Sequence, residues 1–270
     1  MNRIGMKTVG AFLLSLVLSP GASLAAEDSI YSEKVPDPYH VWTRVGDYTE
    51  SLRAVEAAEL SPNGRLAVSA SKFGYNLMCW RVADGALLWE KTLESEIECI
   101  TFSPDGSFIA SGDENYMLRI WDAGNGGLLA EREHDSGLDG LAWSPDGKRI
   151  ATGSENGDLW IWSTDGYTLE RKVPLGSTIN SVNFTADSVR AAVGGNIQTP
   201  LGDGSTRYTG FAKIIEVESG EVLASFGEFP ASVKSIRYSN DESLVATGSF
   251  DNVVRVFDVA SGANQFEKQL

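Results

Sequence analysis

The strongest constraint on the fold of this chain is an internal repeat of about 41 residues. Five short segments align, and their first residues are 42, 41, 41 and 54 positions apart. The segments are LSPNG from Leu60, FSPDG from Phe102, WSPDG from Trp143, FTADS from Phe184 and YSNDE from Tyr238. A second column of apolar residues keeps the period and predicts a buried structural position: Trp80, Trp121, Trp162, Ile215 and Phe257. Such a repeat predicts similar units that bury their apolar faces against one another.

Each unit has the pattern of four short β-strands. Runs such as IECITF, SFIASG, MLRIWD and ALLWEKTL are rich in residues that favour strands, and polar turns separate them. In the Ser-Pro-Asp-Gly turns, proline presets one backbone angle and glycine accepts a conformation that other residues resist. Beyond the first 26 residues, no segment shows helical periodicity. An all-β fold of four-stranded units is therefore expected.

These segments resemble the WD-repeat family of β-propellers, from Val55 to about Asp258. The resemblance rests on the FSPDG-type turns, the ASG and ATG segments, and the strand that ends at Trp121-Asp122. It implies a propeller of five recognisable four-stranded blades over residues 41–270. The family's Gly-His pair survives only as His134, which is assigned a structural role. Most of the polar network that braces each blade in the family is absent, so packing between sheets must stabilise the fold.

The strand count leaves the closure of the ring open. Five sets of inner strands are accompanied by six candidate outer strands. Members of this family commonly close the ring by letting an N-terminal strand complete the last blade. Val41–Val45 would be that strand here, and Asn264–Leu270 would be surplus. A closed ring and a monomer are preferred, and the alternative is an incomplete ring that a second copy or another protein completes.

The N-terminus has the layout of a secretory signal peptide. Arg3 and Lys7 precede the apolar run 9–18, then Pro20 and Gly21, and small residues follow up to position 26. The apolar run is shorter than the roughly 20 residues of a membrane-spanning helix. The chain is therefore predicted to comprise a signal peptide (1–26), a linker (27–40) and the propeller. An exported protein, periplasmic or secreted and without a membrane association after cleavage, is expected.

The net charge argues against nucleic-acid binding, and the cysteine content bears on whether the chain has a disulfide bond. The chain has 22 Lys and Arg residues against 37 Asp and Glu residues, for a net charge of −15. Such an excess of negative charge argues against nucleic-acid binding, which relies on basic residues that neutralise phosphates. Cys79 and Cys99 are the two cysteines. Two small buried thiols are preferred over a disulfide bond.

Few residues in the sequence could form a catalytic site. The two histidines, His40 and His134, cannot build a histidine-based metal site or a catalytic triad. The glycine-rich stretches fall in turns and do not follow the pattern of a phosphate-binding loop. Glu96 and Glu98 are expected to be solvated. No catalytic residue, metal site or cofactor is therefore predicted, and the chain is not expected to be an enzyme.

One column of polar residues stands at the start of the first strand of each unit. By the resemblance, this column lines the mouth of the central channel on the face that family members use to bind partners. Three acids among five positions would give the mouth a negative bias; the alternative is that these residues are polar because the rim is wet. The column comprises Glu56, Glu98, Asp139, Asn180 and Lys234.

The fourth unit carries an insertion between Gly195 and Gly210. It interrupts the turn between the second and third strands, which places it on the same face as the polar column. Long loops on rigid scaffolds are often functional, although a tolerated surface insertion is an equal alternative. Arg207 and Tyr208 are residue types enriched at binding hot spots. The turn residues Tyr75, Tyr116 and Phe250 would extend the patch.

These observations favour a non-enzymatic interaction scaffold that binds a protein or peptide across this face. The alternative is a propeller hydrolase or lactonase with a metal ion bound by carboxylates at the channel mouth. Tight Ca²⁺ binding that stabilises the folded state would favour that alternative.

Overall fold

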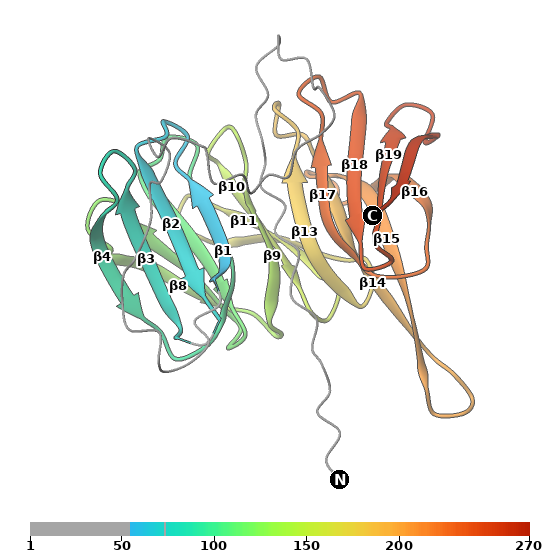
Figure 1. The fold of residues 1–270 in the computed structure, drawn as a ribbon, viewed down its shortest axis with the longest axis horizontal. Helices are drawn as coiled ribbons and strands as arrows, with labels where there is room; N and C mark the ends of the chain where they lie inside the picture. The colour runs from blue at the N-terminus through green and yellow to red at the C-terminus, as the bar shows by residue number, and fades with distance from the viewer. Residues whose placement is uncertain (1–54, 73) are drawn as a thin grey trace, which may run out of the picture. The chain divides into compact units, whose positions relative to one another are not determined.

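The five repeats fold as five antiparallel sheets of four strands each, and every sheet takes four consecutive strands (Figure 1). The structure is a computed structural model, and it describes residues 55–270 apart from residue 73. The predicted all-β class and the five four-stranded blades are confirmed. Within the described residues no helix is long and apolar enough to cross a membrane. The predicted signal peptide, the linker and Val41–Val45 lie outside these residues.

The strands are six to eleven residues long, and equivalent strands follow one another at the repeat spacing. The first strands are β1 (Val55–Leu60), β5 (Ile97–Phe102), β9 (Leu138–Trp143), β13 (Thr178–Phe184) and β17 (Val233–Tyr238). The second strands are β2 (Leu66–Ser71), β6 (Phe108–Asp113), β10 (Arg149–Ser154), β14 (Arg190–Pro200) and β18 (Leu244–Ser249). The third strands are β3 (Asn76–Arg81), β7 (Met117–Asp122), β11 (Asp158–Ser163), β15 (Thr206–Glu216) and β19 (Val253–Asp258). The outer strands are β4 (Ala86–Thr92), β8 (Leu128–Glu133), β12 (Leu169–Pro174), β16 (Val222–Phe229) and β20 (Asn264–Gln269).

The repeated turn between the first and second strands has the conformation that its residues predict. Gly106 has a φ of 74°, and Gly64 and Gly147 take the same left-handed conformation. Ser188 and Glu242 occupy this position in the two divergent repeats and also have positive φ, 62° and 58°. A side-chain hydroxyl that donates to an Asp or Asn oxygen braces each turn, as where Ser103 Oγ lies 2.6 Å from Asp105 Oδ1.

Apolar residues fill the spaces between neighbouring sheets. The first strands contact one another in sequence, β1 with β5, β5 with β9, β9 with β13 and β13 with β17. Trp121 and Trp162 are each only 4% exposed, and Ile215 and Phe257 are equally buried. Trp80 differs, because it is only half-buried. Closure of the ring stays a prediction.

Hydrogen bonds and ion pairs between side chains brace the blades. The indole N–H groups of Trp121 and Trp162 donate to Ser111 Oγ (2.9 Å) and Thr152 Oγ1 (3.1 Å). His134 Nε2 lies 3.4 Å from the same Thr152 hydroxyl, and burial lowers the pKa of His134 to about 4. The histidine is therefore neutral near pH 7, which suits a structural role.

Arginine–carboxylate pairs take part in this bracing in the second and fifth blades, which sequence analysis did not anticipate. Arg119 pairs with Asp113 on the neighbouring strand and with Glu131 on the outer strand. Arg255 pairs with Asp251 in the turn before its own strand and with Glu267 on the outer strand. One guanidinium of the third strand thus joins the segments on both of its sides, because it can hydrogen-bond several carboxylate oxygens at once.

The C-terminal segment is the fourth strand of the fifth blade, so its expected role as a surplus strand is wrong. β20 pairs with β19 from Phe257↔Asn264 to Val253↔Gln269. The free edge of β19 is satisfied by the next segment of the chain, which is the shortest possible connection for an antiparallel strand.

Both cysteines are free thiols, as preferred from the sequence. Cys79 and Cys99 are buried in the apolar clusters between the first three blades. Burial raises the pKa of the Cys79 thiol to about 11 and also raises the pKa of Cys99. Both are therefore protonated small apolar side chains at neutral pH.

Candidate functional site

The predicted polar column lies at the beginning of the first strand of every blade. Glu56, Glu98, Asp139 and Lys234 are each the second residue of their strand, and Asn180 is the third residue of β13. Their charges converge on one region, because Lys234, Glu155, Glu56 and Lys72 all act on the pKa of Asp139. We call this region, defined by the column and the turn residues beside it, the rim.

A second column of rim residues was missed except for Phe250, which the sequence had predicted. The register of each first pair of strands places an equivalent residue directly after the second strand in four blades and within the longer β14 in the fourth blade. The five-unit alignment contains this column too, so the repeat register was the signal that could have revealed it. The residues are Lys72, Glu114, Glu155, Asn196 and Phe250.

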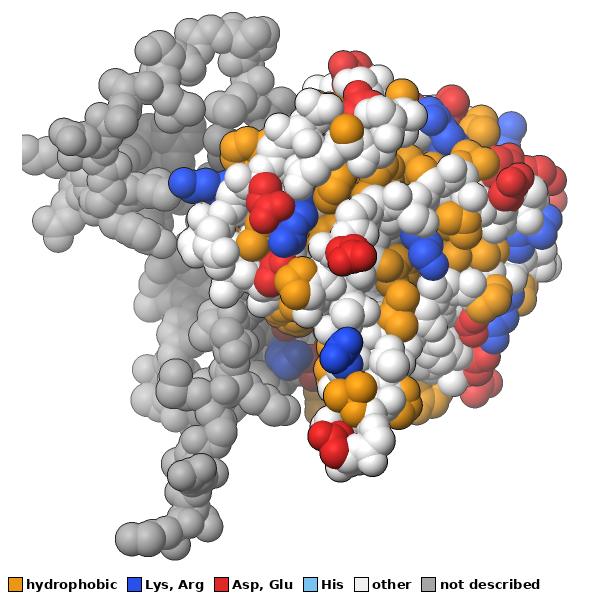
Figure 2. All heavy atoms as spheres, turned by 90° about the vertical axis from the view of Figure 1, so that its right-hand side faces the viewer, with side chains coloured by type: hydrophobic (Ala, Val, Ile, Leu, Met, Phe, Trp, Pro, Cys, Tyr) orange, Lys and Arg blue, Asp and Glu red, His pale blue; other side chains and the backbone are white. Residues whose placement is uncertain are grey.

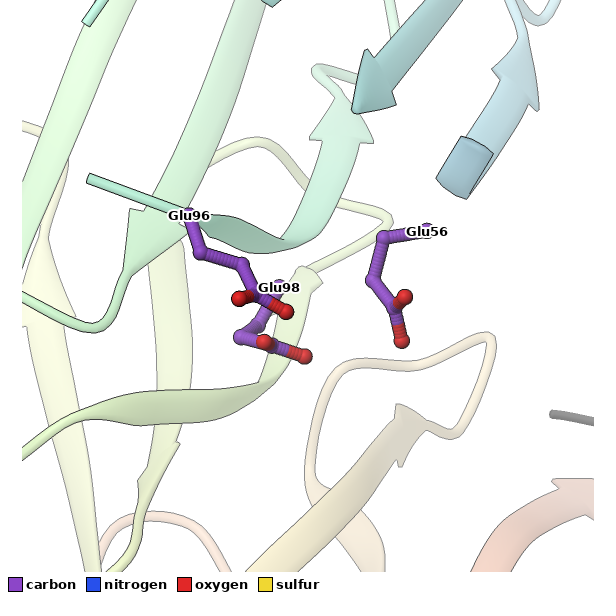
Figure 3. A group of neighbouring side chains, drawn as sticks. All are labelled: Glu56, Glu96 and Glu98. Carbon is purple, nitrogen blue, oxygen red and sulfur yellow. The ribbon is translucent and has the colours of Figure 1, made fainter. Parts of the chain in front are cut away.

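One half of the rim is an acidic cluster around Lys72. Its ammonium group forms ion pairs with Glu96, with Glu98 (3.6 Å) and with Glu56 (3.7 Å). Figure 3 shows Glu96 and Glu98 side by side, with the carboxylate of Glu56 facing them. Only 20% of the Glu96 side chain and 12% of the Glu98 side chain are exposed. The expectation that these two carboxylates are solvated is therefore wrong, because the start of β5 turns them toward Lys72.

Burial dominates the electrostatics of this acidic half. Burial raises the pKa of Glu98, and the neighbouring Glu96 raises it further, although Lys72 opposes the shift. Burial also raises the pKa of Glu114 and of Asp139. Additional negative charge is thus unfavourable here, and an added positive charge would be stabilised.

In the part of the chain that the structure describes, two groups of three carboxylates are close enough to hold a cation. They are Glu56, Glu96 and Glu98, and then Glu98, Glu114 and Asp139. Carboxylate oxygens suit hard cations such as Ca²⁺. In the first group, however, the ammonium group of Lys72 already forms ion pairs with all three carboxylates. The chain thus supplies a cation of its own at this position.

The insertion is a β-hairpin and not the loop that its length and composition predicted. β14 and β15 pair without interruption from Arg190↔Glu216 to Pro200↔Thr206. At the tip, the backbone N–H of Leu201 donates a hydrogen bond to the carbonyl oxygen of Ser205, at 2.8 Å, and this bond closes the hairpin. We call the part from Asn196 to Gly210 the arm. It projects from the fourth blade at the lower right of Figure 1 and at the bottom of Figure 2.

The arm lies on the rim face, as the sequence predicted. β1, β13 and β17 point upward in Figure 1, so their rim ends lie at the bottom, in the direction of the arm. Tyr208 pairs with Gln198, whereas Arg207 pairs with Thr199, so the two predicted side chains project from opposite faces of the arm. Tyr208 is 52% exposed.

The base of the arm forms a pocket with the rim residues of the third, fourth and fifth blades. We call it the arm pocket; its volume is about 340 Å³. Five predicted site residues line it, together with Asn196 of the second column and Ser232, which the sequence did not predict. The five are Asp139, Asn180, Tyr208, Lys234 and Phe250.

Hydrogen bonds order the wall of the arm pocket. The amide of Asn180 donates to Ser232 Oγ and to the carbonyl of Val233, both at 2.9 Å. Lys234 Nζ donates to Asn180 Oδ1 at 3.0 Å and lies 5.2 Å from the ring centroid of Phe250. The wall thus carries a positioned ammonium group and a 63% exposed aromatic ring.

The other predicted residues lie outside this pocket. Glu56 and Glu98 belong to the acidic half of the rim. Tyr75 and Tyr116 are exposed at equivalent turns of the first two blades, where both have positive φ. They lie on the rim face but do not line the arm pocket.

A family model confirms the repeats that the geometry indicates. The WD domain, G-beta repeat model matches residues 90–122, 128–163 and 220–258. Each match ends at the last residue of a third strand: Asp122, Ser163 or Asp258. The chain carries WD40 repeats. WD40 domains are typically protein-interaction scaffolds and are usually not catalytic. A search among curated proteins finds no match to this chain.

Proposed function

We propose that this WD40 domain is a non-enzymatic scaffold that binds a protein or peptide on its rim face. We further propose that it acts outside the cytoplasm, in the periplasm or outside the cell, because its N-terminus follows the pattern of a signal peptide. The observation that carries the binding proposal is the arm pocket. The arm and the polar column are unrelated sequence features, yet they form the walls of one cavity.

The chemistry of this face suits a polypeptide partner. Tyr208 and Phe250 offer exposed aromatic rings, and the surrounding rim offers charged and amide groups. Interfaces concentrate their binding energy in such aromatic anchors with a polar surround. A ring held on paired strands also loses little conformational freedom when a partner binds.

The proposal is tested by crosslinked capture from exported fractions with a variant that lacks the arm. Replacing Gln198–Tyr208 with Asn-Gly joins the pair Ile197↔Thr209 through a two-residue hairpin turn and leaves the blade intact. We expect capture of the partner to fall by about tenfold or more, since hot-spot residues are lost. The double variant Tyr208→Ala, Phe250→Ala should act in the same direction.

A matched control lies on the opposite face. Asp105 is exposed in a turn between first and second strands, so Asp105→Lys should leave capture unchanged. Charge reversal of Glu98 is a poor test, because this residue is packed beside Lys72. Capture that survives loss of the arm and is abolished by Asp105→Lys would refute the proposed face.

The carboxylate groups of the rim support one second candidate, a hydrolase or lactonase that binds a metal ion there. For the scaffold, we expect Ca²⁺ at millimolar concentration to leave the thermal midpoint unchanged, because the ammonium group of Lys72 already pairs with each carboxylate of the first group and occupies the position of a metal ion. A ligand at 100 times its Kd would stabilise the folded state by about 2.7 kcal/mol. A clear rise in the midpoint that Glu98→Gln removes would instead favour the metal-dependent enzyme.

A further inference from the structure

We propose that the arm pocket binds the side chain of an arginine residue of the partner, with its guanidinium group at Asp139 and its hydrocarbon stem against Tyr208 or Phe250. The inference rests on the proposed function and names the chemistry of the partner. It is carried by the charge, the aromatic rings and the size of the pocket.

The strongest support for this inference comes from the side chain of Asp139. Its side chain is largely removed from water at the start of β9 and lines the pocket. Among residues 55–270 that the structure describes, no hydrogen bond or ion pair reaches its carboxylate, whereas Glu56, Glu96 and Glu98 share Lys72. A half-buried carboxylate without a partner is unfavourable, and an incoming cation that donates hydrogen bonds would relieve that cost.

The two aromatic rings select the kind of cation. Tyr208 comes from the arm and Phe250 from the turn after β18, so the rings approach the pocket from different blades. Lys234 shows that a cation is accommodated here, because its ammonium group already lies near the Phe250 ring. A guanidinium group binds a carboxylate through two parallel bonds, which an ammonium group cannot do, while the hydrocarbon stem that carries it packs against an aromatic ring.

The volume of the pocket fits one side chain. At about 340 Å³ it stands at the small end of the range of about 300–1,000 Å³ for ligand pockets. An extended peptide crossing the rim would therefore place one residue in the pocket and the remainder against the arm and the acidic cluster. Lys234 limits the affinity, because its charge repels the incoming guanidinium.

The experiment is an NMR titration of the full chain with N-acetyl-arginine methylamide and with the uncharged, isosteric citrulline compound. We expect the arginine compound to shift the side-chain amide signals of Asn180 and Asn196, and the citrulline compound to bind at least about tenfold more weakly. Asp139→Asn should weaken arginine binding by about tenfold. Lys234→Gln keeps a donor for Asn180 Oδ1 but removes the charge, and should tighten binding about threefold.

The opposite signs of the two charge variants make the test decisive. Equal binding of the citrulline compound, or arginine binding that is unaffected by both Asp139→Asn and Lys234→Gln, would overturn the inference. Lys234 and Phe250 are exposed, so Lys234→Gln and Phe250→Ala report on the pocket even if Asp139→Asn disturbs folding. If loss of the arm abolishes capture but the arginine compound does not bind, the inference fails and the proposed function stands. If the arginine compound binds as expected but capture is independent of the arm, the proposed function fails instead.

Discussion

Replacing Trp121 with alanine is expected to lower the free energy of unfolding by about 3–5 kcal/mol. Trp121 is buried in the apolar cluster that joins the first and second blades, among residues such as Leu77 and Ile109. The substitution leaves a cavity in that cluster and deprives the Ser111 hydroxyl of its indole donor. Urea unfolding at equilibrium, followed by far-UV circular dichroism, measures the change.

Trp80→Ala is the matched control, because it removes the same side chain at the equivalent position of the first blade. Trp80 is only half-buried, so its loss should destabilise the chain by clearly less, about 1–2 kcal/mol. Trp121→Phe keeps most of the ring volume and should lie between the two. A cost below about 1 kcal/mol for Trp121→Ala would contradict the burial of this position.

The free energy of unfolding is expected to fall as the pH rises from about 5 to about 8, with Glu59 as a main cause. Glu59 accepts hydrogen bonds from the backbone N–H of Phe102 (3.2 Å) and the hydroxyl of Thr101 (3.4 Å). Burial nevertheless raises its pKa to about 7 from the ordinary value of 4.5. The folded state thus holds a proton that the unfolded state has released. The stabilisation is complete below about pH 4.5 and is lost as the pH passes 7, at a cost of up to about 3 kcal/mol.

Glu59→Gln isolates this contribution. The amide keeps an acceptor for Phe102 N–H but cannot ionise, so the variant should exceed the original chain in stability at pH 8 and match it more closely at pH 5. Chemical unfolding at both pH values measures the difference. Asp105→Asn is the control, because hydrogen bonds from Ser103 and Ser107 lower the pKa of Asp105, so its contribution to stability is constant from pH 5 to pH 8 and is lost only as the pH falls below about 4. An unchanged pH profile in Glu59→Gln would refute the prediction.

Much of the fold was readable in the sequence because its signals are local. The Ser-Pro-Asp-Gly turns, the alternating strands and the apolar column are each set by residues close together in the chain, and the repeat multiplies each signal. The same register placed Asp139, Asn180 and Lys234 on one face, and the break in the register revealed the arm. The second rim column was equally present in the alignment.

Other features depend on distances that the repeat does not encode. The arm was predicted as a loop because its Gly, Pro and Asp residues are typical of turns, yet uninterrupted pairing with the opposite strand outweighs those preferences. Trp80 occupies the same column of the repeat as Trp121, but its side chain is only half-buried. Asn264–Leu270 was expected to be surplus because strand counting does not show which edge a strand will join.

The sequence by itself determined the all-β repeat architecture, the positions of the strands and the face on which the polar column and the insertion lie. Those properties follow from period and alternation, which act over a few residues at a time. Only the tertiary structure decided that Lys72 pairs with Glu96 and Glu98, that the Asp139 carboxylate has no hydrogen-bond or ion-pair partner among the described residues, and that Tyr208 and Phe250 line one pocket. These outcomes join residues from different blades, and their energies depend on burial and on separations of a few ångströms that neighbouring sheets set when they pack.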